Sequence, residues 1–236
     1  MSSTTWTTTA VASERRPWKG RAWRMVEAQH VASTMKLVDD ADEQALLETL
    51  IDASKPRAPA GTAHLHYLLA TPFRYSPRRG GSRFRDRDDP GVFYGAQGVR
   101  TACMEMGYWR WRFLMDAPAL DGLAPLAFTA FATRLRTEAI DLQRAPFDRD
   151  AAAWTHPVDY APTQAFARIA RDAGVGALLY RSVRDPTPAW CVALLTPAGF
   201  DAPRPEPGEQ TWWLRVTRTQ AQWKRDREAW TWTPPS

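Results

Sequence analysis

The sequence is poor in cysteine and histidine, the residues that most often build disulfide frameworks and metal sites. It has two cysteines, Cys103 and Cys191, and four histidines in 236 residues. Two cysteines do not make a disulfide scaffold, and no cysteine or histidine cluster has zinc-like spacing. His64 and His66 would share one face of a strand, and we interpret them as structural. The sequence therefore predicts no bound metal and a reducing compartment.

Long apolar runs and targeting signals are also missing. No stretch of about eighteen apolar residues occurs, so the sequence predicts no membrane span. The first residues, MSSTTWTTTAVASERRPW, lack the charged start and the apolar block of a secretory signal. We therefore expect a cytoplasmic protein with no membrane contact.

Lysine is rare although the chain is basic. The formal net charge is +5, and only four of the 31 basic residues are lysines, Lys19, Lys36, Lys55 and Lys224. Acidic residues are interspersed throughout and no basic tail is present, so we expect no direct nucleic-acid binding. A basic nucleic-acid-binding module without enzymatic activity stays as the alternative, because YWRWRF at 108–113 interleaves aromatic residues with arginines.

The common glycine-rich phosphate-binding motifs are absent. No GK[ST] follows a glycine-rich loop, and no GxGxxG follows a predicted strand. P-loop and Rossmann nucleotide sites are therefore excluded.

What is present is the composition of a globular protein, with 44% apolar and 24% charged residues and enough length for one sizeable core. Short strands and a few helices alternate unevenly, which favours a single α+β domain. We expect an N-terminal extension over residues 1–20, a catalytic domain over 21–218 and a C-terminal tail over 219–236 that packs on that domain.

Periodicity and capping signals predict the individual elements. Helices are expected at 38–55, where Asp40 begins a capping box and Leu46 and Leu50 belong to the buried face, at 101–115 with Thr101 as N-cap, and at 160–174. Residues 63–75 suit a strand or another buried segment. The other strands are expected at 21–26, 92–94, 125–143, 176–182, 190–195 and 212–216.

The stretch from Thr71 to Asp116 carries the strongest functional signal. Arg83 on a loop, Tyr94 on a strand and Glu105 on a helix fall eleven residues apart and then eleven again. A guanidinium grips phosphate, an aromatic ring stacks on a heterocycle and a carboxylate stabilises positive charge. These three residue types on three elements suit a site for a charged nucleotide.

The loop at 74–89 is crowded with arginines, and Gly80 and Gly81 within it let the backbone approach a ligand. Most of these arginines belong to a solvated loop, and one or two are expected to grip a pyrophosphate. The spacing does not say which. The arginines are Arg74, Arg78, Arg79, Arg83, Arg85 and Arg87.

One reaction uses all three residue types. When nicotinamide leaves NAD+, positive charge spreads over the ribose. A carboxylate such as Glu105 stabilises that charge, an aromatic ring such as Tyr94 stacks on the leaving heterocycle, and Arg83 holds the diphosphate. Composition and spacing leave this as one hypothesis among several.

Four short motifs in order resemble the RES-domain family, the toxins of RES–Xre type bacterial toxin–antitoxin pairs. They are GSRF at 81–84, PGVFY at 90–94, ACME at 102–105 and YRSVR at 180–184. The family is named for an arginine, a glutamate and a serine, which here match Arg83, Glu105 and Ser182. The resemblance covers roughly residues 21–200.

The resemblance implies a fold similar to ADP-ribosyltransferase toxins, with a small split β-core and helices around an NAD+ cleft. It implies that NAD+ is the substrate, and that the products come from protein mono-ADP-ribosylation or from NAD+ hydrolysis or phosphorolysis. Arg83, Glu105 and Ser182 would be catalytic. Tyr94 and Arg24 would bind substrate.

Other positions and the partners follow from the same resemblance. The segment before Arg83 is longer and more basic than the family pattern, so Arg74 and Tyr75 join the substrate-binding candidates. The long segment 117–160 offers a surface for a protein that accepts ADP-ribose. The implied partner is an Xre-like antitoxin that covers the active site.

Overall fold

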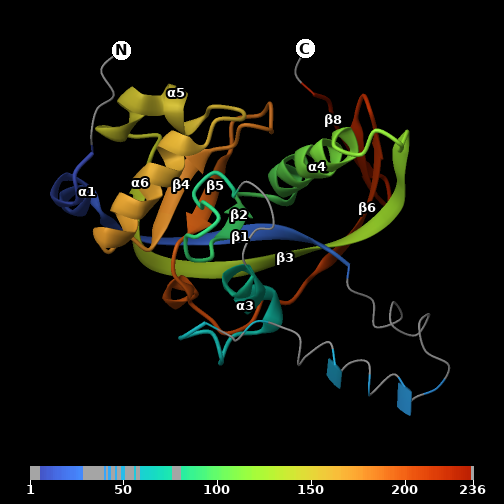
Figure 1. Cartoon of the computed structure of the whole chain (residues 1–236), viewed down its shortest axis with the longest axis horizontal. Coiled ribbons are helices and arrows are strands. Elements are labelled where there is room, and N and C mark those ends of the chain that lie inside the picture. The colour runs from blue at the N-terminus through green and yellow to red at the C-terminus, as the bar shows by residue number, and fades with distance from the viewer. Residues whose placement is uncertain are drawn as a thin grey trace.

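Two long strands cross the molecule and organise the fold (Figure 1). The structure is a computed structural model that describes residues 6–28, 40, 42–43, 46, 49–50, 56, 59–75 and 81–234. Strand β1 (Arg16–Glu27) pairs antiparallel with β3 (Gly122–Asp141) along its whole length. Because side chains alternate between the two faces of a strand, this ladder divides the core into two apolar clusters, one on each face.

Five strands close into a ring. From β1 the order continues through β2 (Phe93–Ala96), β5 (Trp190–Leu194) and β4 (Ala177–Arg181) to β3. Trp23 of β1 pairs with Ala96 of β2, while β1 also pairs with β3. The short ladder at Trp23 is therefore where the ring closes.

The sheet is split along one edge of β3. Phe128 and Ala139 both pair with β1, and on the other edge Phe128 pairs with β6 (Gln210–Thr217) while Ala139 pairs with β4. Strands β6 and β4 therefore pair with the same edge of β3, near its opposite ends. The loop at 200–206 lies between them and donates backbone hydrogen bonds to β3. The α+β class and the split core predicted from the sequence are confirmed.

Helices cover both faces of the β1–β3 ladder (Figure 1). Helix α4 (Val99–Met115) packs on β1, β6 and the C-terminal strands, and α6 (Ala161–Asp172) packs with the short α5 (Ala151–Trp154) and with α1 (Thr8–Glu14). Helix α3 (Tyr67–Arg74) lies across the ladder on the opposite side. Short 3-10 turns run over Phe147–Asp150 and Pro197–Gly199.

The C-terminal region belongs to the sheet. Strands β7 (Ala221–Arg225) and β8 (Glu228–Trp232) follow β6 as an antiparallel meander. Trp212 and Trp223 are fully buried beneath α4, and the Trp212 ring stacks on Trp230 with centroids 4.3 Å apart. Residues expected to form a packed tail therefore extend the sheet and support the underside of α4.

Two expectations about the segment before residue 76 were wrong. Residues 67–74 form a helix and not a strand: His66 Nδ1 accepts a hydrogen bond from the Leu68 N–H, and Leu69 and Phe73, four residues apart, are buried. In the helix expected at 38–55, most of which lies outside the described residues, Asp40 does cap the Glu43 N–H. Its Leu46 and Leu50 are exposed and not buried.

The other predicted helices and strands are present, with shifted ends. One or two strands were expected over 125–143, and the structure has a single strand of 20 residues there, β3 (Gly122–Asp141). Helix α4 ends at Met115 as predicted, but its N-cap is Gly98. None of the helices among the described residues is long and apolar enough to cross a membrane.

Candidate active site

A cavity of about 200 Å³ opens between α4, the ring closure at β1 and β2, and the loop around Arg83. Four of the seven site residues expected from the sequence line it: Arg83, Tyr94, Glu105 and Arg24. The full lining consists of Trp23, Arg24, Met25, Ser82, Arg83, Tyr94, Gly95, Ala96, Ala102, Glu105, Met106, Trp109, Tyr160, Tyr180, Arg184 and Cys191.

Glu105 is the carboxylate of this cavity, and it is half-buried on α4. Its Oε1 accepts hydrogen bonds from the Ser182 hydroxyl at 2.6 Å and from the Val183 N–H at 3.3 Å, and the Cys191 thiol lies 3.9 Å away. All three contacts are made to Oε1, and no described residue forms a hydrogen bond to Oε2. Oε2 is therefore the oxygen available to a ligand.

Ser182 lies behind Glu105 and does not line the cavity. The side chain is buried, and its oxygen accepts the Arg184 and Asp185 N–H groups at 3.3 and 3.1 Å while donating to Glu105. The Asp185 carboxylate in turn accepts the Thr101 hydroxyl and forms an ion pair with Arg100, both in the first turn of α4. This turn after β4 is therefore fastened to the helix that carries Glu105.

Arg83 projects from a tight turn and is 8% exposed. Its Nη1 donates to the carbonyls of Trp154 and His156, at 2.8 and 3.0 Å, and its guanidinium lies 4.8 Å from the centre of the Tyr160 ring. Nη1 thus holds the guanidinium group in place through two carbonyls. The rest of the planar group faces a site where anions would be gripped bidentately.

Arg24 contributes a second guanidinium from β1. Its Nη1 donates to the Tyr94 carbonyl at 2.8 Å, and its Nε is buried with no partner among the described residues. Burial lowers the pKa of Arg24 to about 10, and its guanidinium packs 5.0 Å from the Phe93 ring centre. A half-buried cation with an unpaired donor is suited to an anionic ligand.

Tyr94 supports the site through its hydroxyl as well as its ring. The hydroxyl oxygen accepts the Phe84 N–H at 3.0 Å and lies 2.8 Å from the Ser82 hydroxyl. Burial raises the pKa of the Tyr94 phenol, so the group is protonated at neutral pH. Tyr94 thereby ties the turn that carries Arg83 to strand β2.

Aromatic rings border the cavity on the side toward α6. Trp109 on α4 is 43% exposed, and its ring centre lies 6.4 Å from that of Tyr160. Arg184 packs against the Tyr108 ring and donates to the Pro157 carbonyl. Neither Tyr160 nor Trp109 was predicted from the sequence as a lining residue. Trp109 lies four residues after Glu105 on α4, a spacing that could have indicated it, whereas only the fold brings Tyr160, just before α6, next to α4.

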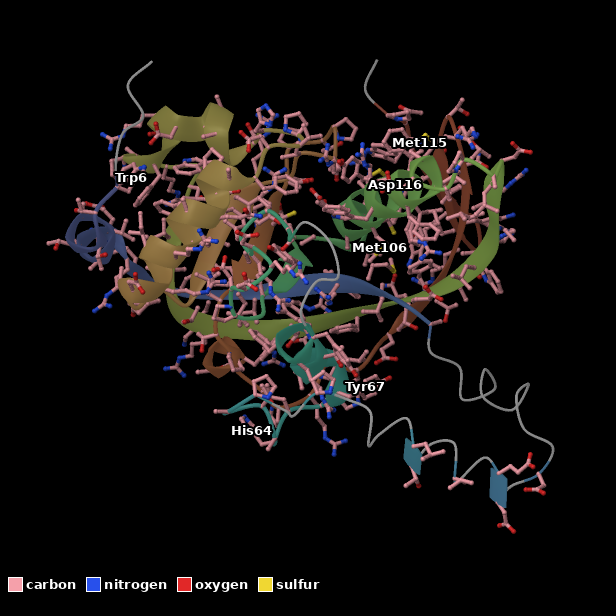
Figure 2. All side chains as sticks on the ribbon, in the orientation of Figure 1. Trp6, His64, Tyr67, Met106, Met115 and Asp116 are labelled. Atoms are coloured by element: carbon pink, nitrogen blue, oxygen red, sulfur yellow. The ribbon has the colours of Figure 1, made fainter. Side chains whose placement is uncertain are left out.

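Arg74 and Tyr75 do not line the cavity. Arg74 is the last residue of α3 and Tyr75 follows it, on the other side of the β1–β3 ladder. Figure 2 shows His64 and Tyr67 on that side too, away from Met106 on α4. Arg74 Nε donates to the Pro56 carbonyl, and the Tyr75 carbonyl accepts from Arg85 at 2.8 Å. The hydrogen bonds of Arg74 and Tyr75 are therefore made to other parts of the chain, outside the cavity lining.

Metal ligands do not gather in this site. Within the part of the chain that the structure describes, no group of three or more His, Cys, Asp or Glu side chains is arranged to hold a metal ion. The groups that line the cavity suit an organic ligand with an aromatic ring and anionic groups.

Comparisons with known proteins identify the family and the fold. The sequence pattern of the RES domain matches residues 56–217. A solved structure with a similar fold is the MbcT–MbcA toxin–antitoxin complex of M. tuberculosis: the TM-score is 0.52, the identity is 12%, and the alignment covers 86% of this chain and 90% of that chain. At that identity the likeness establishes a shared fold. No curated protein matches the sequence.

Proposed function

The chain belongs to the RES-domain family, and on that premise we propose that it is the toxin of a toxin–antitoxin pair and cleaves the nicotinamide–ribose bond of NAD+. The observation that carries the proposal is the Glu105 carboxylate, fixed by Ser182 in the wall of a cavity that also holds two arginines and several aromatic rings. The similarly folded protein from M. tuberculosis is itself part of a toxin–antitoxin complex.

The chemistry of NAD+ explains why a carboxylate is needed. The pyridinium nitrogen of NAD+ already carries the positive charge, so nicotinamide leaves as a neutral molecule when it takes the bonding electron pair. Leaving requires no proton, and the positive charge passes to the ribose ring. A fixed anion close to that ring stabilises the transition state more than the ground state, which raises kcat. We assign this role to Glu105.

The cations and rings around Glu105 would bind and orient the substrate. Arg83 and Arg24 would neutralise the diphosphate, while Tyr94, Trp109 and Tyr160 would border the nicotinamide–ribose end. A cavity of about 200 Å³ is smaller than the about 300–1,000 Å³ of typical ligand sites. It therefore suits the reacting end of the dinucleotide, and the adenosine end would lie outside it.

The acceptor of the ADP-ribose group decides the reaction class. Water, phosphate or a protein side chain would each attack the same ribose carbon after nicotinamide leaves. These acceptors correspond to an NAD+ glycohydrolase, a phosphorylase or a mono-ADP-ribosyltransferase. For partners, we propose an Xre-like antitoxin that covers the cavity, and a protein target if transfer to protein occurs.

Incubation of the purified protein with NAD+, with and without phosphate and with a desalted lysate, tests the proposal. Release of free nicotinamide is expected from the wild type. A gain of one ADP-ribose mass on a protein would identify a transferase, and free or phosphorylated ADP-ribose would identify destruction of NAD+. No nicotinamide under any of these conditions would overturn the proposal and favour the nucleic-acid-binding alternative, which predicts strongly salt-dependent retention on DNA.

A further inference from the structure

The turn that carries Arg83 has a defined geometry. Ser82 and Arg85 exchange both backbone hydrogen bonds, N to O distances 2.6 and 3.2 Å, so Arg83 and Phe84 occupy the two central positions. Phe84 is fully buried with its ring 4.9 Å from that of Tyr180, while Arg83 lines the cavity. Gly81 just before the turn has φ +68, and a Cβ there would lie 2.4 Å from the Arg85 carbonyl oxygen.

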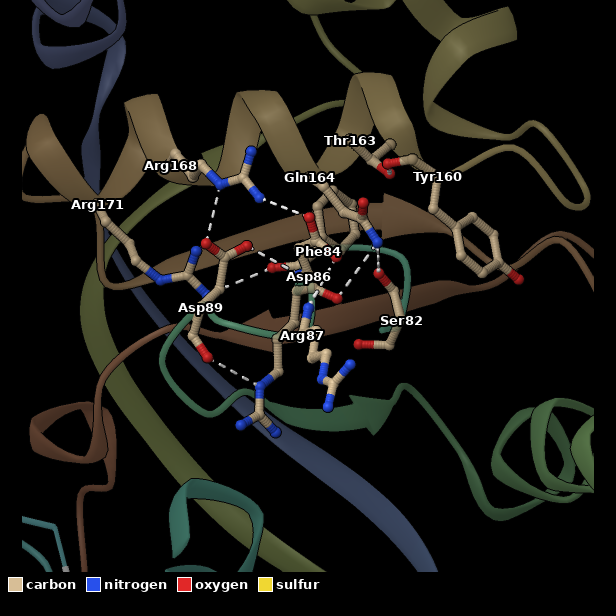
Figure 3. A network of polar contacts seen from close by, with 11 residues as sticks. Ser82, Phe84, Asp86, Arg87, Asp89, Tyr160, Thr163, Gln164, Arg168 and Arg171 are labelled. Atoms are coloured by element: carbon tan, nitrogen blue, oxygen red, sulfur yellow. Dashed lines mark hydrogen bonds and ion pairs between the residues drawn. The ribbon is translucent and has the colours of Figure 1, made fainter. Parts of the chain in front are cut away.

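Side chains of helix α6 donate hydrogen bonds to all four backbone carbonyls of this turn. Figure 3 labels the three side chains that reach the turn from the helix, Thr163, Gln164 and Arg171. The Gln164 amide donates to the carbonyls of Ser82 and Arg85, at 3.0 and 3.3 Å. The Thr163 hydroxyl donates to the Arg83 carbonyl, and Arg171 Nη2 donates to the Phe84 carbonyl at 3.3 Å. Three side chains of one helix therefore form hydrogen bonds with the backbone of four consecutive residues.

The helix also holds the chain that follows the turn. Arg168 forms ion pairs with Asp86 at 2.9 Å and with Asp89 at 2.8 Å (Figure 3). Arg168 is about half exposed, and solvent screening makes such pairs weak. The contacts of Thr163 and Gln164 are more buried. The Thr163 hydroxyl lies within hydrogen-bond distance of two carbonyls, that of Arg83 in the turn and that of Tyr160 at the start of α6 (2.9 Å). The Gln164 amide contacts two carbonyls of the turn.

The same segment holds the other end of Arg83. The guanidinium donates to the Trp154 and His156 carbonyls and lies over the Tyr160 ring, while the carbonyl of Arg83 accepts from Thr163. The backbone and the charged head of one residue are thus both fixed by residues 154–164. A merely space-filling role for Thr163 would be met equally by valine, which has the same shape and no hydroxyl.

We infer that Thr163 and Gln164 are positioning residues, which hold the turn at Ser82–Arg85 so that the Arg83 guanidinium faces the diphosphate of the substrate. The inference rests on the proposed function, because it assigns Arg83 to an anionic ligand. It adds residues that never touch the ligand and act through Arg83. Substitutions at them affect substrate binding more than the bond-breaking step, because Glu105 and Ser182 lie on other elements.

Four single variants test the inference: Thr163→Val, Thr163→Ser, Gln164→Met and the control Thr71→Val. Thr71 is an exposed threonine of α3 whose hydroxyl bonds to its own helix at Tyr67. Steady-state kinetics with NAD+ should show KM raised about tenfold in Thr163→Val and Gln164→Met, with kcat changed less than about twofold, as expected for loss of a hydrogen bond that orients a charged group. Thr163→Ser and Thr71→Val should keep the wild-type KM.

A second readout does not depend on turnover. Amide hydrogen exchange of the peptides that cover residues 81–90 should become faster in Thr163→Val and Gln164→Met, and stay unchanged in Thr163→Ser and Thr71→Val. Unchanged exchange in Thr163→Val overturns the inference. So does faster exchange with an unchanged KM, and so does a fall in kcat at constant KM, which indicates only a smaller folded fraction.

The two proposals fail in different ways. If the wild type releases no nicotinamide, the proposed function is wrong, and the exchange measurement alone decides whether α6 holds the turn. If the wild type turns over NAD+ and Thr163→Val behaves like Thr163→Ser in both measurements, the proposed function stands and the role of α6 is wrong.

Discussion

The hydroxyl of Ser182 donates a 2.6 Å hydrogen bond to Oε1 of Glu105, although the two residues lie on the turn after β4 and in the middle of α4. The contact is held from both sides. Asp185, three residues after Ser182, binds Arg100 and Thr101 in the first turn of α4. One carboxylate oxygen is thereby fixed by protein, and the orientation of the other follows, which is the kind of preorganisation that electrostatic catalysis requires.

Replacement of Glu105 by glutamine should strongly lower turnover without unfolding the protein. Glutamine keeps the shape and can still accept the Ser182 hydroxyl, but it carries no charge to stabilise the ribose cation. We expect kcat to fall about 100- to 1,000-fold, the range seen when a charge-stabilising group is removed, with a similar urea midpoint. The control Glu209→Gln alters an exposed glutamate outside the cavity lining. Near wild-type nicotinamide release by Glu105→Gln would show that this carboxylate has no role.

Ser182→Ala should lower kcat and leave KM for NAD+ nearly unchanged. Ser182 contacts Glu105 and does not line the cavity, so its loss loosens the carboxylate without removing a substrate contact. The substitution also leaves the Arg184 and Asp185 N–H groups without their acceptor, and we expect a loss of about 1–3 kcal/mol in the free energy of unfolding. Kinetics and urea denaturation measure the two effects. A large rise in KM would instead indicate that Ser182 touches the substrate.

Arg83→Lys should raise KM for NAD+ strongly. Lysine has a single ammonium group, which cannot donate to the Trp154 and His156 carbonyls and also grip a phosphate bidentately. The control Arg87→Lys makes the same change in an exposed arginine of the same loop. Titration calorimetry in a Glu105→Gln background separates binding from turnover. Equal NAD+ affinity in the two lysine variants would remove Arg83 from phosphate binding.

Both thiols should be unreactive in the native protein at neutral pH. Burial raises the pKa of Cys103 and of Cys191, and the neighbouring Glu105 carboxylate raises that of Cys191 further. The thiolate is the reactive form, so alkylation by iodoacetamide should be slow below about pH 9 and become complete after denaturation in urea. Mass analysis of the alkylated peptides checks this. Rapid modification of native Cys191 would mean that the wall behind Glu105 opens readily in solution.

Helix α3 shows the limit of local patterns. The alternating residues around His64 and His66 suggested a strand, yet residues 67–74 are helical because Leu69 and Phe73 find apolar partners under the sheet. Thr101 is a good N-cap residue by type, but its hydroxyl is used by Asp185 from a distant turn, and the helix begins two residues earlier. In both cases a tertiary contact outweighed a local preference.

The sequence by itself determined the α+β class, most helices and strands, and the residue types of the site, because periodicity and capping are local and the motifs around Arg83, Glu105 and Ser182 are contiguous. The family resemblance grouped Arg24 with Arg83, Tyr94 and Glu105, which line one cavity. Only the tertiary structure decided that Arg74 and Tyr75 do not line it. The same holds for Thr163 and Gln164, whose contacts with the Arg83 turn span about 80 residues. Such contacts depend on how the strands close and the helices pack, and pairing between distant segments leaves no periodic signal in the chain.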